Sequence, residues 1–149
     1  MNKLLTSLLL CTSAYAYPQT NSYNQRLADS LGADEYGMKM YSLVILKTGV
    51  SSSLSKKESD SIFVGHLHNI QRLAKEGKLV AAGPLGKNDK NYRGIFILNT
   101  KTIDEAKQLL QTDPAIYHKL LDVEVFQWYG SAALPMYLNF HDKVQKKSF

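Results

Sequence analysis

Two histidines one residue apart, His66 and His68, are the side chains of this sequence best suited to proton transfer. Imidazole gains and loses a proton near neutral pH and is a common metal ligand. The surrounding residues indicate a helix, in which positions i and i+2 lie about 200° apart around the axis. The two rings therefore cannot share one metal ion. His66 falls at the edge of the apolar side of this helix, and His68 falls on the solvent side.

Two aspartates, Asp113 and Asp89, occupy segments that favour turns. Asp113 directly precedes Pro114 after a helical pattern, and Asp89 lies in a loop of Gly, Asn and Lys residues. Aspartate is common in such turns because its carboxylate accepts hydrogen bonds from nearby backbone N–H groups. Spacing alone leaves each of them either a turn residue or a functional carboxylate. It likewise leaves His66 either a core histidine or a functional one.

The loop that follows the second predicted strand carries glycine, lysine and arginine. The segment Gly83–Lys87 lacks the Ser or Thr after Gly-Lys and the glycine spacing of a nucleotide-binding loop. Lys87, Lys90 and Arg93 are placed to attract a small carboxylate or phosphate, although surface lysines and arginines also serve solubility. The sequence contains no hydrolase or zinc-protease motif. We expect neither a cofactor nor a bound metal ion.

The first sixteen residues differ from the rest of the chain. A short basic start at Lys3 is followed by an apolar run over 4–11 and by Ala14-Tyr15-Ala16. This order is typical of a secretory signal peptide, and the apolar run is shorter than the roughly 20 residues that span a bilayer. The alternatives are a retained membrane anchor or a lipoprotein anchor at Cys11. We expect cleavage at about Ala16 and a secreted or periplasmic protein with no membrane attachment.

Cysteine content and charge exclude several kinds of chemistry and partner. Cys11 is the only cysteine, so the cleaved chain has no disulfide, thiol nucleophile or thiolate metal site. The net charge of the 149 residues is +5, but the basic residues are scattered. The local excess at Lys143, Lys146 and Lys147 is typical of a solvated tail. We therefore expect no nucleic acid partner.

Hydrophobic periodicity predicts the elements that must position these residues. Strands are predicted at 40–46, 79–82, 94–98 and 121–128, and helices begin at the Ser55–Glu58 and Thr102–Glu105 capping boxes. Gly77 is expected to end the first helix, and Pro114 is expected to end the second. In the first helix, Phe63, Leu67, Ile70, Leu73 and Ala74 form the predicted core-facing stripe. The predicted organisation is a signal peptide (1–16), a leader with a short helical turn (17–38), one domain (39–129) and a tail (130–149).

The order strand, helix, strand, strand, helix, strand predicts the fold. It is the split βαβ pattern of a ferredoxin-like α+β sandwich, with two helices on one face of a four-stranded antiparallel sheet. The other face of the sheet is left bare. Since an apolar sheet face must be covered, we expect a homodimer that packs two such faces together.

Four segments in this order resemble proteins of the YCII-related family. They read FVGHLHNIQRL at 63–73, GKLVAAGP at 77–84, GIF at 94–96 and TDPA at 112–115. The resemblance spans roughly 40–128 and implies a ferredoxin-like fold of the dimeric α/β-barrel kind. It also implies a histidine–aspartate pair in a cleft beside the sheet. By position the histidine is His66 and the aspartate is Asp113, with Asp89 as the alternative.

Two functions follow from this resemblance. The first is an enzyme with lyase- or isomerase-like acid/base chemistry on a small organic acid or lactone, in which His66 exchanges the proton and Asp113 orients it. The second is a non-catalytic ligand-binding or structural dimer, in which His66 is a packing residue. The sequence leaves both open, because a fold does not determine a function.

Overall fold

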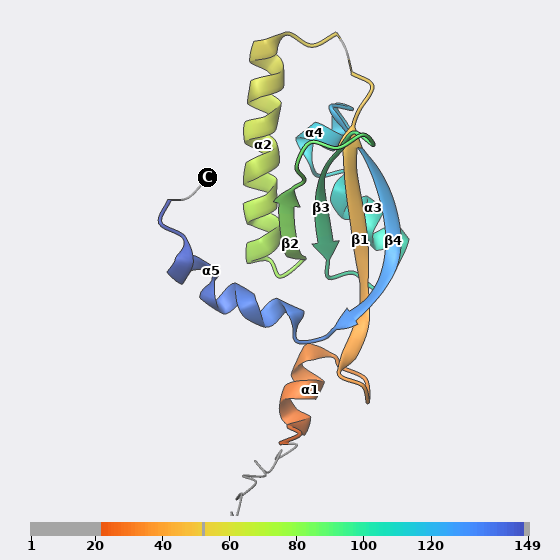
Figure 1. The fold of residues 1–149 in the computed structure, drawn as a ribbon, viewed down its shortest axis with the longest axis vertical. Coiled ribbons are helices and arrows are strands. Elements are labelled where there is room, and N and C mark those ends of the chain that lie inside the picture. The colour runs from red at the N-terminus through yellow and green to blue at the C-terminus, as the bar shows by residue number, and fades with distance from the viewer. Residues whose placement is uncertain (1–21, 52, 148–149) are drawn as a thin grey trace, which may run out of the picture.

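The computed structural model describes residues 22–51 and 53–147 (Figure 1). The predicted signal peptide, residues 1–16, lies outside these residues, so its cleavage stays a prediction. The strands are β1 (Met38–Thr48), β2 (Leu79–Pro84), β3 (Tyr92–Leu98) and β4 (Leu121–Ser131). The helices are α1 (Gln25–Leu31), α2 (Lys56–Lys75), α3 (Ile103–Leu110), α4 (Pro114–Tyr117), η1 (Leu134–Tyr137) and α5 (Leu138–Val144).

The four strands form one antiparallel sheet in the order β2-β3-β1-β4. The long β1 lies between β3 and β4, and its pairing with β4 runs without interruption from Met38 opposite Ser131 to Thr48 opposite Leu121. This arrangement confirms the predicted ferredoxin-like α+β fold. The observed strands are longer than the apolar runs from which they were predicted, because ladder hydrogen bonds continue into polar flanking residues.

The hydrophobic core lies on one face of the sheet, beneath the helices. Alternate strand residues point toward this face, as the pleat of a strand requires. Its buried members come from every strand and from the helices between them: Val44, Leu46, Leu73, Leu79, Phe96, Leu98, Ala106, Leu110, Ala115, Ile116 and Leu121. α2, α3 and α4 thus pack against the same face, and the opposite face carries no helix from this core.

The helix α2 begins and ends as its sequence predicts. Ser55 accepts a hydrogen bond from the Glu58 backbone N–H, and the Glu58 carboxylate accepts one from the Ser55 N–H, which completes a capping box. Gly77 follows the helix with φ +67°, a conformation that costs other residues a steric clash. The 20-residue helix that carries His66 is therefore bounded by local chemistry at both ends.

The buried face of α2 is rotated relative to the predicted stripe. Phe63 and Leu67 were predicted to face the core, but their side chains are 36% and 37% exposed. The buried residues of this helix are His66, Asn69 and Leu73. The prediction was wrong at Phe63 and Leu67 because two polar residues occupy the buried face, and hydrophobic periodicity does not register them.

The second half of the domain also differs from its prediction in two local features. Thr102 accepts a hydrogen bond from the Glu105 N–H, but the Glu105 carboxylate binds the N–H of Lys101 instead of Thr102, so the capping box is incomplete. Pro114 was expected to end a helix. It instead opens α4, since α3 has ended at Leu110 and proline is well suited to the first position of a helix.

Residues on both sides of the domain are ordered into short helices. α1 falls within the predicted leader, where Asn24 caps its start and Gly32 its end. After β4 the tail crosses toward β2 through η1 and α5 (Figure 1), and the Tyr137 hydroxyl donates a hydrogen bond to the Val80 carbonyl. Within residues 22–51 and 53–147, no helix is both long enough and apolar enough to cross a membrane.

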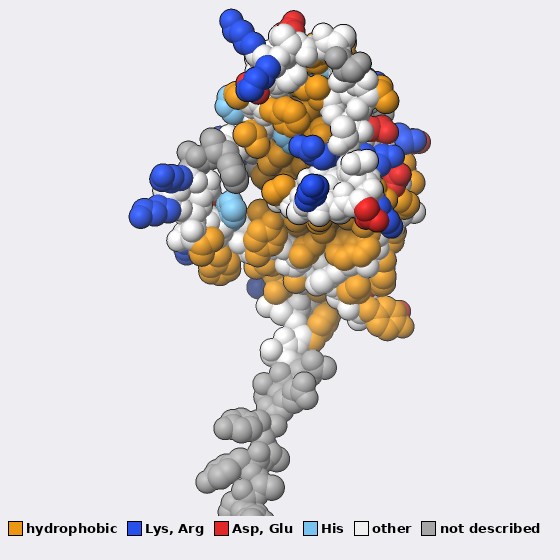
Figure 2. All heavy atoms as spheres, turned by 45° about the horizontal axis from the view of Figure 1, so that its top comes forward, with side chains coloured by type: hydrophobic (Ala, Val, Ile, Leu, Met, Phe, Trp, Pro, Cys, Tyr) orange, Lys and Arg blue, Asp and Glu red, His pale blue; other side chains and the backbone are white. Residues whose placement is uncertain are grey.

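Several large apolar side chains are exposed on the surface. Figure 2 shows one face on which hydrophobic side chains gather across the middle, with Lys and Arg side chains among them. Phe126 on β4 is 49% exposed, and Tyr129 on the same strand is also exposed. On the helix-free face the half-buried residues Ile45 and Ile95 pair directly across β1 and β3. This face therefore retains the uncovered apolar surface that the fold predicts.

Candidate functional site

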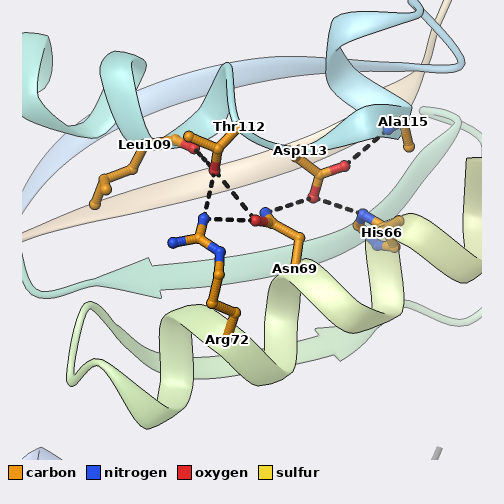
Figure 3. Close-up of polar contacts among 7 residues, drawn as sticks. All are labelled: His66, Asn69, Arg72, Leu109, Thr112, Asp113 and Ala115. Carbon is orange, nitrogen blue, oxygen red and sulfur yellow. Dashed lines mark hydrogen bonds and ion pairs between the residues drawn. The ribbon is translucent and has the colours of Figure 1, made fainter.

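A histidine–aspartate pair lies between α2 and the start of α4. His66 Nδ1 and Asp113 Oδ2 are 2.7 Å apart (Figure 3). The residues are 8% and 1% exposed, so the contact is almost completely removed from water. The structure thus brings together the two residues that the family resemblance singled out, from positions 47 apart in the chain.

Asp113 has a structural task as well as its contact with His66. Its Oδ1 accepts a hydrogen bond of 2.9 Å from the Ala115 N–H, which makes Asp113 the N-cap of α4. The other oxygen, Oδ2, faces His66 and Asn69. Asp113 is therefore both a turn residue and the partner of His66: Oδ1 caps the helix and Oδ2 contacts the imidazole.

Asn69 lies one helical turn beyond His66 and closes the network on that side. Its Oδ1 accepts hydrogen bonds from Arg72 Nη2 at 2.8 Å and from Thr112 Oγ1 at 3.1 Å. Arg72 can only donate, so it determines which way the amide faces, and Nδ2 then points toward Asp113 Oδ2, 3.5 Å away (Figure 3). Arg72 also binds Thr112 and Glu76. The carboxylate is thus surrounded by groups that donate hydrogen bonds.

A glycine permits the close approach of the two helices that carry the pair. A Cβ atom at Gly65 would lie 3.0 Å from Pro114 Cγ, which is tighter than ordinary carbon–carbon contact. Gly65 directly precedes His66, and Pro114 directly follows Asp113. The residue with no side chain therefore lets α2 pack on α4 at the point where the imidazole must reach the carboxylate.

The contact with Asp113 determines which ring nitrogen of His66 can act on a ligand. An ionised carboxylate only accepts hydrogen bonds, so Nδ1 must carry the proton that it shares with Asp113. The neutral ring then has its free lone pair on Nε2, which is the position of a general base. When the ring is protonated, the adjacent carboxylate stabilises the imidazolium. The pair can therefore accept a proton at Nε2 and return it.

Two aromatic rings contact the imidazole of His66. Phe96 of β3 stacks on the imidazole with centroids 5.9 Å apart and an angle of 22° between the planes. Phe63 meets it edge-on, also at 5.9 Å. These rings fix the plane of the imidazole, so its orientation is set by packing as well as by the hydrogen bond to Asp113.

A cleft of about 320 Å³ opens beside His66, between α2 and the sheet. This volume is at the lower end of the range for small-molecule sites, about 300–1,000 Å³. Its lining is almost entirely apolar: Leu46, Phe63, His66, Leu67, Ile70, Ala82, Gly83, Pro84, Arg93, Gly94, Phe96 and Leu121. The partly exposed Phe63 and Leu67, which the sequence placed in the core, form part of the wall. Their exposure is therefore a consequence of the cleft.

The remaining candidate residues lie elsewhere. Asp89 is exposed in the turn between β2 and β3, and the carboxylate that His66 contacts is that of Asp113. His68 is exposed on the outer side of α2, as the helical geometry predicts. A larger hollow of about 480 Å³ near α3 has mostly polar walls and contains no histidine: Lys78, Asn99, Thr100, Lys101, Glu105, Gln108 and Leu109. The groups suited to proton transfer are thus concentrated at the smaller cleft.

Sequence reasoning missed the residues that hold the pair in place. Asn69, Arg72 and Thr112 were not singled out, although Asn69 lies three positions after His66 and so shares its helix face. That spacing is the signal from which Asn69 could have been found. Among the described residues, 22–51 and 53–147, no cluster of three or more His, Cys, Asp or Glu side chains is placed to hold a metal ion.

Comparison with known protein families assigns the chain to one of them. The model of the YCII-related domain matches residues 40–129, which is most of the chain between the leader and the tail. The chain belongs to the YCII-related domain family. This confirms the resemblance found in the sequence and its extent. The His66–Asp113 pair and the cleft lie wholly within the matched residues.

Two solved structures show similarity to this YCII-related domain. One is 5-chloro-2-hydroxyhydroquinone dehydrochlorinase from Burkholderia phenoliruptrix AC1100 in complex with 2,5-dihydroxybenzoquinone. It is 22% identical, with 58% of this chain and 92% of that chain covered and a TM-score of 0.42. The other is a dimeric protein of unknown function and ferredoxin-like fold from Bacteroides fragilis NCTC 9343, at 10% identity, 62% and 95% coverage and a TM-score of 0.42. Comparison with curated proteins finds no match.

Proposed function

We propose that this YCII-related domain is an acid/base enzyme that acts on a small organic acid or lactone in the cleft beside His66. The observation that carries the proposal is the 2.7 Å contact between His66 Nδ1 and Asp113 Oδ2, buried from water and adjoining an apolar cleft. A buried imidazole that is oriented by a carboxylate is a recurrent means of proton transfer.

Each member of the pair has a distinct role in this proposal. His66 Nε2 removes a proton from a carbon that a neighbouring carbonyl acidifies, and the C–H electrons remain on the substrate as an enolate. Asp113 holds the ring in the required tautomer and stabilises the imidazolium. The enolate then expels a leaving group from the adjacent carbon, as in a lyase, or takes the proton back at another carbon, as in an isomerase. Both outcomes balance without a cofactor.

Deuterium exchange tests proton abstraction without knowledge of the full reaction. Small organic acids and lactones with an acidified C–H are incubated with protein in D₂O, and loss of the proton signal is followed by NMR. We expect His66→Asn to slow exchange by about 100- to 10,000-fold relative to the wild type, the usual contribution of general acid/base catalysis. His68→Asn, an exposed substitution two positions along the same helix, is the matched control and should exchange like the wild type.

The alternative function is a non-catalytic ligand-binding or structural module. The observation that favours it is that the network joins α2 to the segment between α3 and α4 through Asp113, Asn69 and Thr112, so it also clamps the fold. Under this reading, His66→Asn lowers the melting temperature, and the wild type shows no exchange above buffer for any compound. Equal exchange by the wild type and a folded His66→Asn variant would also remove the catalytic role.

We further propose that the domain forms a homodimer through the helix-free face of the sheet. The support is the apolar surface on that face, including exposed Phe126 and half-buried Ile45 and Ile95. Burial of such a surface against a second copy removes it from water. Light scattering should give twice the monomer mass for the wild type, and Phe126→Glu should shift it to monomer. A monomeric wild type would contradict this proposal.

Export is a separate part of the proposal and rests on the sequence pattern at 1–16 alone. We propose that the chain is cleaved after Ala16 and acts outside the cytoplasm. Expression of the full chain followed by cell fractionation and mass spectrometry tests it. The expected product begins at Tyr17 in the periplasmic or extracellular fraction. A cytoplasmic product that retains residues 1–16 would contradict export.

A further inference from the structure

The cleft beside His66 contains one permanent charge. Apart from His66 and Arg93, every residue in its lining is apolar or glycine. No carboxylate belongs to the lining, since Asp113 lies behind the imidazole and faces Nδ1. An arginine in an otherwise apolar wall contributes charge and up to five N–H donors to a site that offers a ligand few other polar partners. The electrostatic character of the cleft therefore depends on Arg93.

The guanidinium of Arg93 has no partner among the described residues. The ion pairs in residues 22–51 and 53–147 involve Lys47, Lys56, His66 and Arg72 instead. The backbone of Arg93 is nevertheless fixed, since its carbonyl accepts a 2.9 Å hydrogen bond from the Leu85 N–H at the base of the β2–β3 loop. The backbone of Arg93 is thus held in place, while its guanidinium can bind a ligand.

The loop that joins the two lining residues Pro84 and Arg93 adds positive charge next to the cleft. Residues 85–91 contain Lys87 and Lys90 against the single carboxylate of Asp89. Lys90 lies over the Tyr92 ring, 6.0 Å from its centroid. With Arg93, this segment carries a net charge of +2, which raises the local concentration of anions and repels cations.

The body of the ligand must match the remaining walls. Phe63 and Phe96 contact the imidazole, while Ala82, Gly83 and Gly94 contribute no bulky side chain to the lining of the cleft. At Gly94 a Cβ atom would lie 2.7 Å from the Gly83 carbonyl oxygen, so no larger residue fits between these strands. A flat apolar ring or short chain suits such walls better than a hydrated polyol.

We infer that the ligand of this cleft is a monoanion, a carboxylate on a planar or compact apolar body, and that Arg93 binds its carboxylate. This inference rests on the proposed function, since it takes the cleft beside His66 as the ligand site. It also sharpens that function, because it selects the organic acid over the neutral lactone. The planar guanidinium matches a carboxylate through two parallel N–H···O bonds and thereby orients the apolar body toward His66.

Matched pairs of charged and neutral ligands test this inference. Benzoate, phenylacetate and cyclohexanecarboxylate are titrated beside their primary amides, which have nearly the same shape and no charge, with binding followed by calorimetry or NMR. We expect the wild type to bind at least one acid more tightly than its amide. Arg93→Gln should weaken acid binding about tenfold and leave amide binding unchanged. Lys87→Gln, an exposed change outside the lining, should alter acid binding by less than about twofold.

The outcomes separate this inference from the proposed function. Equal binding of acids by the wild type and Arg93→Gln, equal binding of acids and amides by the wild type, or no binding of any acid would overturn the role of Arg93. Proton exchange that depends on His66 would still support the enzyme in each case. Conversely, acid binding that depends on Arg93, without any exchange catalysed by the wild type, would support the inference and contradict acid/base catalysis.

Discussion

Two buried polar pairs on the helix-covered side of the molecule differ in what they can do. His66 and Asp113 contact each other beside the apolar cleft, and Ser42 and Thr100 share a 2.8 Å hydrogen bond beside the polar hollow. Both pairs are nearly excluded from water. In both, each side chain has the partner that a buried polar group requires, so both contribute to the fold.

The difference between the pairs lies in proton chemistry. A hydroxyl is a poor proton acceptor, whereas an imidazole has two ring nitrogens through which it can accept and return a proton. Each pair has one member at a cavity, since His66 lines the apolar cleft and Thr100 lines the polar hollow. A buried polar pair in which each group has a hydrogen-bond partner therefore indicates only a structural role. The addition of a titratable ring that reaches a ligand-sized cavity distinguishes the candidate site.

Among substitutions in these pairs, the largest loss of stability is expected from removal of the Asp113 carboxylate. Asp113→Ala leaves the His66 Nδ1–H and the Ala115 N–H buried without an acceptor, so we expect a loss of about 2–5 kcal/mol in the free energy of unfolding. Chemical denaturation measures it. Asp113→Asn, which can still cap α4, should lose less. Equal stability of the wild type and Asp113→Ala would show that the His66–Asp113 pair does not contribute to the free energy of unfolding.

Gly65→Val tests whether helix packing sets the geometry of the pair. The added side chain would overlap Pro114, so we expect a loss of about 1–3 kcal/mol and a weaker acid/base activity from displacement of His66. Ser61→Val is the matched control, since it puts the same β-branched residue at an exposed position of the same helix and should change stability by less than about 0.7 kcal/mol. Unfolding curves and deuterium exchange are compared for both. An unchanged exchange rate in Gly65→Val would mean that the site tolerates a shift of α2.

The neutral pair should give a smaller effect that is confined to stability. Ser42→Ala deprives the Thr100 hydroxyl of its acceptor, at an expected cost of about 1 kcal/mol in the free energy of unfolding. Combined Ser42→Ala and Thr100→Val should recover part of this loss, since neither group is then left unpaired. Ligand binding and exchange in the cleft should remain those of the wild type. A change in either would show that the two polar pairs are coupled.

The exposed pair of Asp34 and Tyr129 is expected to give the smallest effect on stability. The Tyr129 hydroxyl is the main cause of the lowered pKa of Asp34, followed by the Met38 N–H. Because the folded pKa lies below the ordinary value of 3.8, the contact stabilises the fold above pH 3.8 and is lost as the pH falls through the folded value. Tyr129→Phe should therefore be slightly less stable than the wild type at neutral pH and equal to it in strong acid. A difference that persists in strong acid would exclude Asp34 as the cause.

The fold was predictable because its signals are local. Capping at Ser55, the left-handed turn at Gly77 and the apolar runs of the four strands are properties of neighbouring residues, and their order limits the topology. The boundaries were less predictable, since hydrogen bonds carry β1 and β4 beyond their apolar runs. Pro114 was misplaced because one residue type ends some helices and begins others, and only the backbone before it decides.

The site was predictable only in part. The resemblance of the segments around His66 and Asp113 to YCII-related proteins identified the pair, but periodicity assigned Phe63 and Leu67 to the core. A hydrophobic residue has the same pattern whether it faces a core or an empty cleft. The contacts of Thr112 with Asn69 and Arg72 join positions about 40 apart, and no local pattern encodes such a distance.

The hydrogen bond from Tyr137 to the Val80 carbonyl occupies a backbone acceptor on an edge strand of the sheet. β2 is an edge strand, and the register of its pairing with β3 shifts between Leu79 and Ala81, at the residue that Tyr137 contacts. Unpaired strand edges are templates for intermolecular sheets and for aggregation. In β2, the register shift and the hydrogen bond from Tyr137 interrupt the unpaired edge. The tail lies outside the residues matched to the family, yet it contacts the matched domain at an edge where a foreign strand could otherwise pair.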